Sequence, residues 1–143
     1  MAAPHRARPG AADVVVIGGG VIGCAVARKA ALGGLSVVVL ERGRPGAEAS
    51  HAAAGMLSPL AEADGPGLFL DLLLRAREEY PAFAEALRAE TSTDVAYSGA
   101  GTLYLSLRGE DDAELLERLH WQSAAGLPVE RLSAEEVRAL EPA

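Results

Sequence analysis

The sequence predicts an α/β protein that opens with a strand, a glycine turn, a helix and a second strand. Residues 13–17 (DVVVI) are a mostly β-branched run of the kind that is buried in a parallel sheet. Gly18, Gly20 and Gly23 follow in the spacing G-x-G-x-x-G, and residues 36–40 (SVVVL) return as a second apolar strand. This order predicts the β-α-β unit with which dinucleotide-binding domains begin.

Each glycine of the turn has a separate physical role. Gly18 permits a tight turn, Gly20 lets the backbone approach a pyrophosphate, and Gly23 lets the helix press against the preceding strand. Phosphates would lie on the free N–H groups at the positive end of that helix. Glu41 directly follows the second strand, where a carboxylate accepts hydrogen bonds from ribose hydroxyls and repels a 2′-phosphate. The predicted ligand is therefore FAD or NAD.

Composition excludes several classes of partner. The chain has 143 residues, with thirteen Lys or Arg against twenty Asp or Glu and a formal net charge of −7. It has no basic stripe with interleaved aromatic residues, so we expect no nucleic-acid partner. Arg28 and Lys29 interrupt the apolar run 14–40, so we expect no membrane-spanning segment. Residues 1–10 lack the apolar core of a secretory signal, and the expected location is cytoplasmic.

Cysteine and histidine residues predict no metal site. A single cysteine, Cys24, provides neither a disulfide framework nor a thiolate site. It follows the third glycine on the helix face toward the sheet, which predicts a small buried thiol. Neither His5 nor His120 has partners at ligand spacing.

The segment after Glu41 distinguishes the two cofactors. It reads ERGRPGAEASHAAAGMLSP over residues 41–59. The small residues of 49–55 let the backbone pass close to a bulky group. Composition alone also allows an ordinary short helix at residues 52–54.

The motifs together resemble the N-terminal part of the D-amino-acid-oxidase-like flavoproteins, and most closely the glycine oxidases of the thiamine pathway. Those proteins carry GGGVIG, a terminal Glu with a polar neighbour, a small-residue segment with Ser or Thr, and AAAGML followed by Pro. All of these occur here in the same order. The resemblance implies FAD as cofactor. It implies cofactor contacts from Gly18, Gly20, Val21, Ile22, Gly23, Glu41, Arg42, Ala49, Ser50, Ala54, Gly55 and Met56.

The resemblance also implies a reaction. The longer relative would transfer a hydride from the α-carbon of glycine, sarcosine or a related small amine to the flavin, within thiamine thiazole biosynthesis. The family's substrate-binding arginine and tyrosines come from later sequence, so we assign no catalytic residue here and expect this chain alone to be inactive. Two alternatives stay open: a flavin amino-acid dehydrogenase, and a non-catalytic fragment that needs a complementary chain. A homo-oligomer is a further open possibility.

One residue departs from a pattern seen in some relatives. Relatives with covalently attached flavin use a histidine in an HAAG motif, whereas here a third alanine separates His51 from that register. We expect His51 to be a loop residue near the cofactor, without covalent attachment.

The expected domain organisation has three parts. Residues 1–12 form a disordered tail, residues 13–64 a Rossmann-like FAD-binding unit, and residues 65–143 a helical segment with the start of an α+β substrate domain. Only two strands suit the parallel sheet, although its first strand is normally central. We therefore expect an incomplete domain, the N-terminal portion of a longer protein or one piece of a split protein.

Periodicity predicts the remaining elements. An apolar face at three- and four-residue intervals predicts a helix over 69–87, which Pro81 should kink or break. Alternating residues predict a hairpin of 95–98 with 102–107. A helix over 111–125, a strand at 129–132 and a last helix follow. Ser133 and Glu136 have capping-box spacing at the start of this last helix.

Overall fold

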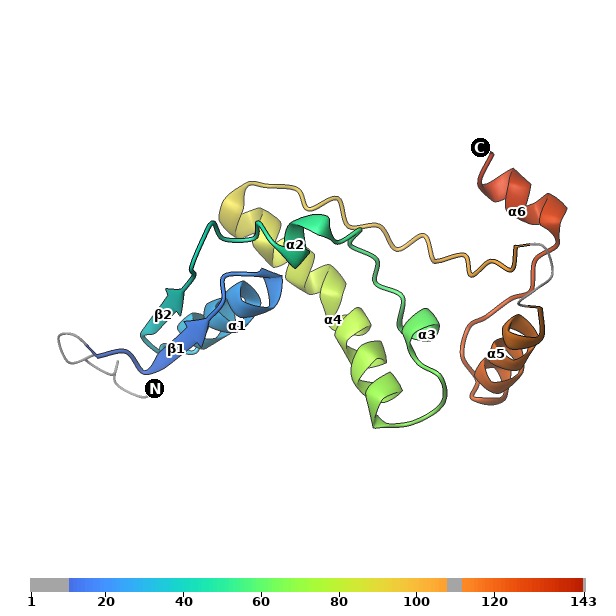
Figure 1. Cartoon of the computed structure of the whole chain (residues 1–143), viewed down its shortest axis with the longest axis horizontal. Coiled ribbons are helices and arrows are strands. Elements are labelled where there is room, and N and C mark those ends of the chain that lie inside the picture. The colour runs from blue at the N-terminus through green and yellow to red at the C-terminus, as the bar shows by residue number, and fades with distance from the viewer. Residues whose placement is uncertain (1–10, 108–111, 143) are drawn as a thin grey trace. The chain divides into compact units, whose positions relative to one another are not determined.

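The structure is a computed structural model that describes residues 11–107 and 112–142. The chain divides into two compact units, Met1–Met56 and Leu57–Ala143. Figure 1 labels the helices and strands of both. The predicted tail, residues 1–12, lies outside the described residues except for its last two, and the functional domain boundary at residue 64 stays a prediction.

The first unit is built on two parallel strands joined by a helix. Strand β1 (Val14–Ile17) leads into helix α1 (Val21–Leu32), and strand β2 (Val37–Leu40) returns beside β1. The register pairs Val14 with Val37 and Ile17 with Leu40. The predicted strand–helix–strand order and parallel pairing are therefore confirmed.

Polar side chains fix this register where the two strands begin. The carboxylate Oδ2 of Asp13 accepts hydrogen bonds from the Ser36 N–H at 2.8 Å and from the Ser36 hydroxyl at 2.6 Å. The Asp13 N–H in turn donates to the Ser36 hydroxyl oxygen at 3.0 Å. With the strands aligned at this end, they also finish together, and their next residues, Gly18 and Glu41, emerge at one edge of the sheet.

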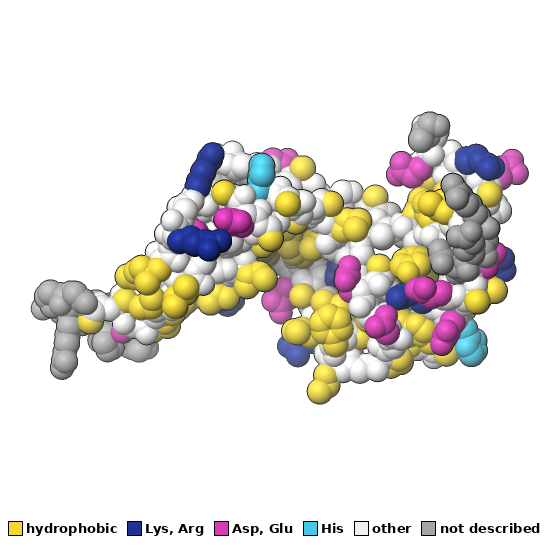
Figure 2. Space-filling model, viewed as in Figure 1, with side chains coloured by type: hydrophobic (Ala, Val, Ile, Leu, Met, Phe, Trp, Pro, Cys, Tyr) yellow, Lys and Arg dark blue, Asp and Glu magenta, His cyan; other side chains and the backbone are white. Residues whose placement is uncertain are grey.

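Helix α1 covers only one face of the sheet. Val14 and Val16 are half-buried, and Ala27 of the helix is buried. Val15 is 55% exposed and Ile17 86%, because alternate residues of a strand point to opposite faces. Figure 2 shows hydrophobic side chains gathered over this β-α-β unit.

Cys24 corrects a prediction. Its thiol is exposed rather than buried, and Sγ lies 3.5 Å from the Gly19 carbonyl oxygen, to which it donates. A sheet of two strands is too narrow to cover the flank of the helix, so the residue after Gly23 has little to pack against.

A one-turn helix, α2 (Ala49–Ala52), follows the sheet. It contains His51, so the prediction that His51 is a loop residue was wrong. His51 is exposed. The turn begins three residues earlier than the alanine run that could have formed a helix, because Ala53 is already extended (φ −71°, ψ 139°).

The described part of the second unit is helical. Helix α3 (Pro59–Glu62) is a single turn, and α4 (Leu68–Thr91) is the longest helix of the described residues. Helix α5 (Asp112–Ala124) and helix α6 (Ala134–Leu140) follow. The capping box predicted for the last helix is confirmed: the Ser133 N–H donates to Glu136 at 2.7 Å, and the Glu136 N–H donates to Ser133 Oγ at 3.3 Å.

Pro81 does not break α4, contrary to one form of the prediction. The proline removes a single backbone donor, the one that would bond the carbonyl four residues earlier. Packing on both sides of it supports a continuous helix. The rings of Tyr80 and Phe83 meet edge to face with centroids 5.7 Å apart, and Ala84 is buried.

The predicted hairpin and the strand at 129–132 are absent from the described residues, whose only strands are β1 and β2. Residues 93–107, which follow α4, run as a chain without strand pairing, as Figure 1 shows. Ala96 has a left-handed conformation (φ 53°), which interrupts the first half of the expected hairpin. A pair of strands that has neither a third strand nor a helix packed against it buries too little surface to be stable.

Candidate cofactor-binding site

The glycine turn connects β1 tightly to α1. Gly18 has φ +103°, a conformation that favours glycine, and its N–H donates to the Leu40 carbonyl oxygen at 2.8 Å. A Cβ atom added at Gly23 would overlap the carbonyl oxygen of Gly18, and it would lie 3.3 Å from Cγ1 of Val16. Only glycine at position 23 therefore lets the first turn of α1 rest on the strand.

Glu41 holds the turn through its carboxylate. Oε2 accepts the Gly19 N–H at 2.8 Å, and Oε1 accepts the Gly43 N–H at 2.8 Å. These backbone hydrogen bonds, led by that from Gly19, lower the pKa of the Glu41 carboxyl below its ordinary value, so it is ionised at neutral pH. A carboxylate has about four acceptor positions, so two remain for other donors.

Ser50 lies over the N-terminus of α1. Its Oγ accepts the Val21 N–H at 2.9 Å, and a Cβ at Gly20 would come within 3.1 Å of the same oxygen. The Gly46 N–H also donates to the Gly19 carbonyl oxygen at 2.9 Å. Residues 41–50 thus contact the glycine turn at several points. The two side-chain hydrogen bonds among these contacts join residues that are 22 and 29 positions apart in the sequence.

The free donors at this helix end suit an anion. The first amides of a helix have no acceptor within it. Of those in α1, the Val21 N–H is bonded to Ser50, which leaves those of Ile22 and Gly23. The Ser50 hydroxyl accepts from Val21 and still carries its own O–H donor. The helix dipole adds positive potential at the same place.

The outer predicted residues are less tightly placed. Arg42 makes a long ion pair with Glu48, 3.6 Å between Nη2 and Oε1, and both side chains are largely exposed. Such a pair contributes little, so the guanidinium is available to a ligand. Ala49 and Ser50 lie in α2. Among the described residues, no hydrogen bond connects the side chains or amides of Ala54, Gly55 or Met56 to the turn.

The structure therefore assembles part of the predicted set and adds residues that sequence reasoning missed. It brings together Gly18, Gly20, Val21, Gly23, Glu41 and Ser50 around the turn. Gly19 was not predicted, although it is buried and bonded to both Glu41 and Gly46. The sequence did offer a signal for this residue, because Gly19 is a glycine at the first x of G-x-G-x-x-G, where the motif does not require one. A Cβ there would lie 3.2 Å from Cβ of Glu41.

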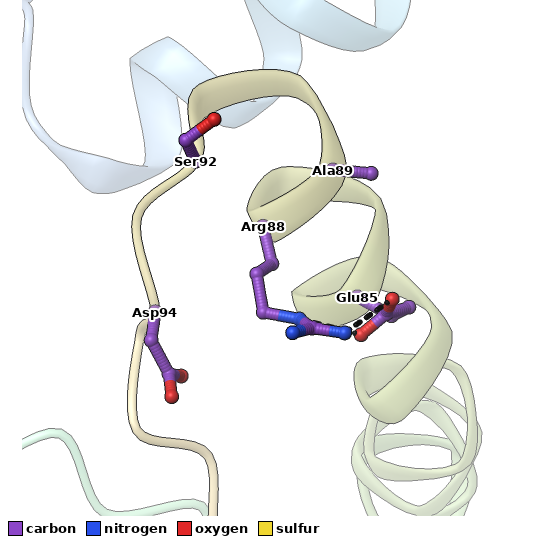
Figure 3. A pocket seen from close by; sticks show the side chains of 5 residues that line it. All are labelled: Glu85, Arg88, Ala89, Ser92 and Asp94. Carbon is purple, nitrogen blue, oxygen red and sulfur yellow. Dashed lines mark hydrogen bonds and ion pairs between the residues drawn. The ribbon is translucent and has the colours of Figure 1, made fainter.

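One surface hollow lies elsewhere, at the end of α4. Its volume is about 550 Å³, and Glu85, Arg88, Ala89, Ser92 and Asp94 line it (Figure 3). The Arg88 guanidinium donates twice to the Glu85 carboxylate, at 2.9 and 3.0 Å. Both charged groups are exposed and already paired, so we assign no site there.

Within residues 11–107 and 112–142, no group of three or more His, Cys, Asp or Glu residues could hold a metal ion. None of the helices there has the length and apolar character needed to cross a membrane.

A parallel β-α-β unit with a glycine turn and an acid after its second strand is typical of nucleotide-binding α/β proteins. Residues 13–143 match the family described as DAO, FAD dependent oxidoreductase. The chain belongs to this family of FAD-dependent oxidoreductases, which confirms the resemblance drawn from the motifs.

Individual relatives agree with this assignment. The chain is 36% identical to glycine oxidase from Bacillus licheniformis over 130 residues, which are 91% of this chain and 34% of the relative. It is 46% identical over 93 residues to the bifunctional protein ThiO/ThiG of Synechocystis, covering 64% of this chain and 14% of that protein. The crystal structure of glycine oxidase from Geobacillus kaustophilus superimposes with a TM-score of 0.86 at 34% identity, over 92% of this chain and 35% of that one. The chain thus spans about a third of the length of the glycine oxidases it matches.

Proposed function

We propose that this chain is the FAD-binding part of an oxidoreductase that oxidatively deaminates glycine or a related small amine. The observation that carries the proposal is the glycine turn with Glu41 and Ser50 hydrogen-bonded into it from the following segment. A Rossmann-like dinucleotide site needs this combination: a close backbone approach, free amides and a carboxylate at one edge of the sheet.

The residues present fit the cofactor. The amides of Ile22 and Gly23 and the Ser50 hydroxyl would donate to the pyrophosphate, where no Cβ of Gly20 obstructs it. The ionised Glu41 would accept from the ribose hydroxyls with its remaining lone pairs. The exposed Arg42 would lie at the adenosine end, where its charge attracts phosphate.

The small residues after Glu48 would lie along the flavin. Ala49 and Ala54 present only methyl groups, and Gly55 has φ +80°, so the chain bends there without a side chain in the way. Met56 is 72% exposed, which leaves its flexible side chain free to pack against a ring. Bound FAD would supply the hydride acceptor, and the chain's own residues supply position and electrostatics.

Names of relatives support the choice of substrate and pathway. Glycine oxidases are matched in several bacteria, and the ThiO/ThiG proteins connect the matched region to thiamine biosynthesis. We propose glycine or a sarcosine-type amine as substrate of the longer protein. A related dehydrogenase stays the alternative, which oxygen consumption with glycine would distinguish.

FAD titration of the purified chain tests the cofactor site. We expect weak but saturable binding, measured by quenching of flavin fluorescence, and no peroxide from glycine. Gly20→Val should abolish binding, because its side chain meets Ser50 Oγ and fills the approach to the phosphates. Gly65→Val is the matched control, since a Cβ there has nothing within 4 Å. Equal FAD affinity in Gly20→Val and wild type would contradict the site.

A further inference from the structure

Residues 44–47 form a tight turn that contacts the glycine motif. The Ala47 N–H donates to the Arg44 carbonyl oxygen at 3.2 Å, which closes a four-residue β-turn with Pro45 and Gly46 at its centre. Gly46 has φ +74°. The proline ring holds the φ of Pro45 at about −65°. Negative φ at the first central residue and positive φ at the second define a type II turn. We call residues 44–47 the Pro45–Gly46 turn.

The type of turn decides where the Gly46 N–H points. A type II turn uses only the N–H of its fourth residue internally, so the Gly46 N–H is left for another acceptor. It donates to the Gly19 carbonyl oxygen at 2.9 Å. In the commoner type I turn the central peptide is turned over by about 180°, and the Gly46 N–H would point away from Gly19. Type II needs positive φ at its third residue, which glycine adopts without strain.

This hydrogen bond fixes one peptide of the glycine motif. Gly19 is buried, and its N–H is already bonded to Oε2 of Glu41 at 2.8 Å. Its carbonyl oxygen accepts from Gly46, with a longer contact from the Cys24 thiol at 3.5 Å. The Gly19 carbonyl belongs to the same planar peptide as the Gly20 N–H, and in a trans peptide the two groups point in opposite directions. Holding the carbonyl therefore sets the direction of the Gly20 N–H.

The Gly20 amide is a further free donor at the start of α1. Gly20 is the N-cap of this helix, with extended backbone (φ −76°, ψ 178°). Among residues 11–107 and 112–142, its N–H has no hydrogen-bond acceptor. The amides of Ile22 and Gly23 lie at the same end of the helix. A pyrophosphate at this end would accept from such amides, and hydrogen bonds to a charged acceptor are stronger than those to a neutral one.

We propose that Pro45 and Gly46 are positioning residues for the pyrophosphate of FAD. Their turn fixes the peptide between Gly19 and Gly20, so the Gly20 amide is oriented as a donor before the cofactor binds. A donor that is already oriented loses less conformational entropy on binding. Neither positioning residue needs to touch the cofactor for this role. The inference rests on the proposed function, which it extends to residues that support the site.

The test compares Gly46→Ala with Gly46→Asn and the control Gly34→Ala in the whole 143-residue chain. Gly34 has φ +86°, and a Cβ at either glycine would have nothing within 4 Å, so alanine introduces the same kind of backbone strain at both positions. Gly34 follows the other end of α1, and its N–H donates to Ala31. Asparagine tolerates positive φ better than alanine, so Gly46→Asn should keep the turn.

Three measurements report the effect. Flavin fluorescence gives the Kd for FAD, and calorimetry gives the Kd for ADP, which carries the same adenosine and pyrophosphate without the flavin. NMR of the isotope-labelled chain reports the Gly20 amide. In Gly46→Ala we expect both Kd values to rise about tenfold or more, because a hydrogen bond to a charged group is weakened, and the Gly20 signal to shift. Gly34→Ala should lose similar stability but bind both ligands like wild type, as should Gly46→Asn.

The wild-type chain provides a further measurement that needs no variant. If the bond from Gly46 to Gly19 favours FAD binding, bound FAD must favour that bond by the same factor. Hydrogen exchange of the Gly46 amide should therefore slow by about tenfold more than that of the Gly34 amide when FAD is added. This measurement decides the question if Gly46→Ala does not fold.

The outcomes separate the two proposals. Unchanged Kd values in Gly46→Ala, or equal slowing at Gly46 and Gly34 in the FAD complex, overturn the positioning role alone. Equal loss of binding in Gly46→Ala and Gly34→Ala also overturns it, because backbone strain by itself would then explain the loss. Failure of the wild-type chain to bind FAD contradicts the proposed function, and the positioning role with it.

Discussion

Replacement of Gly23 by alanine gives the sharpest test of the structure. In most helices this change is favourable, because alanine loses less backbone entropy on folding, and it gains about 0.5–1 kcal/mol. Here the new Cβ would overlap the carbonyl oxygen of Gly18. The backbone fixes the position of the Cβ, and the atom that it meets is a backbone oxygen, so neither a rotamer change nor a flexible side-chain end can relieve the overlap.

We therefore expect Gly23→Ala to destabilise the chain, whereas the same substitution stabilises most helices. Overpacking of a fixed site costs about 1–3 kcal/mol, occasionally more, and the overlap of a Cβ with a backbone oxygen belongs at the upper end. After the helix-propensity gain is subtracted, we expect a net destabilisation of about 2 kcal/mol. The first turn of α1 would also have to move away from Val16, whose Cγ1 lies 3.3 Å from the added atom. The amides of Ile22 and Gly23 would move with it.

Urea unfolding followed by circular dichroism measures the stability difference, with Gly65→Ala as the control. No atom lies within 4 Å of a Cβ at Gly65, so that variant should stay within about 0.5 kcal/mol of wild type. A Gly23→Ala chain as stable as wild type would refute the claim that the helix rests on the strand at this glycine. FAD titration of the same variant should show the loss of binding that follows from displaced amides.

Two other changes test the segment that contacts the turn. Ser50→Ala removes the acceptor of the Val21 N–H, so it should destabilise the chain by about 0.5–2 kcal/mol, the usual range for a lost helix cap, and weaken FAD binding. The control Ser50→Thr keeps the hydroxyl and should preserve both the stability and the FAD affinity. Hydrogen exchange in α1 measures the first effect, and FAD titration measures the second. Glu41 adds a pH dependence: its pKa is lower in the folded chain, so its stabilising contribution is full above the unfolded pKa of about 4.3 and is lost as pH falls through the folded value. The difference in stability between wild type and Glu41→Gln, followed by urea unfolding from pH 7 to pH 3, should therefore shrink toward the acid end. A difference that grew on acidification would contradict the two backbone hydrogen bonds to the carboxylate.

Local patterns were sufficient to predict the two strands and the first helix of the first unit. A β-branched run, a glycine spacing and a second apolar run each act over a few residues, and together they predicted β1, α1 and β2 with their parallel pairing. The same motifs led to the family, because AAAGML and the terminal Glu41 belong to the chain itself and need no structure to be seen. The capping box of Ser133 and Glu136 is equally local.

Elements that depend on distant partners were predicted less well. The alternation over residues 102–107 is compatible with a strand, but a strand needs neighbours, and none pairs with it in the described residues. Cys24 has the sequence position of a buried thiol, yet the two-stranded sheet leaves it exposed. Pro81 was expected to disturb α4, and packing around Tyr80 and Phe83 accompanies an uninterrupted helix.

The sequence by itself determined the β-α-β unit, the glycine turn and the family, because backbone conformation and hydrophobic period are set by neighbouring residues. Only the tertiary structure decided which donors and acceptors meet. That Glu41 bonds to Gly19, Ser50 to Val21, and Arg118 to Ala61 and Ala63 depends on parts of the chain 22 to 57 residues apart. No local pattern encodes these pairings, because hydrogen bonds form between groups that folding brings within about 3 Å of each other, and many residues of the same type could have served.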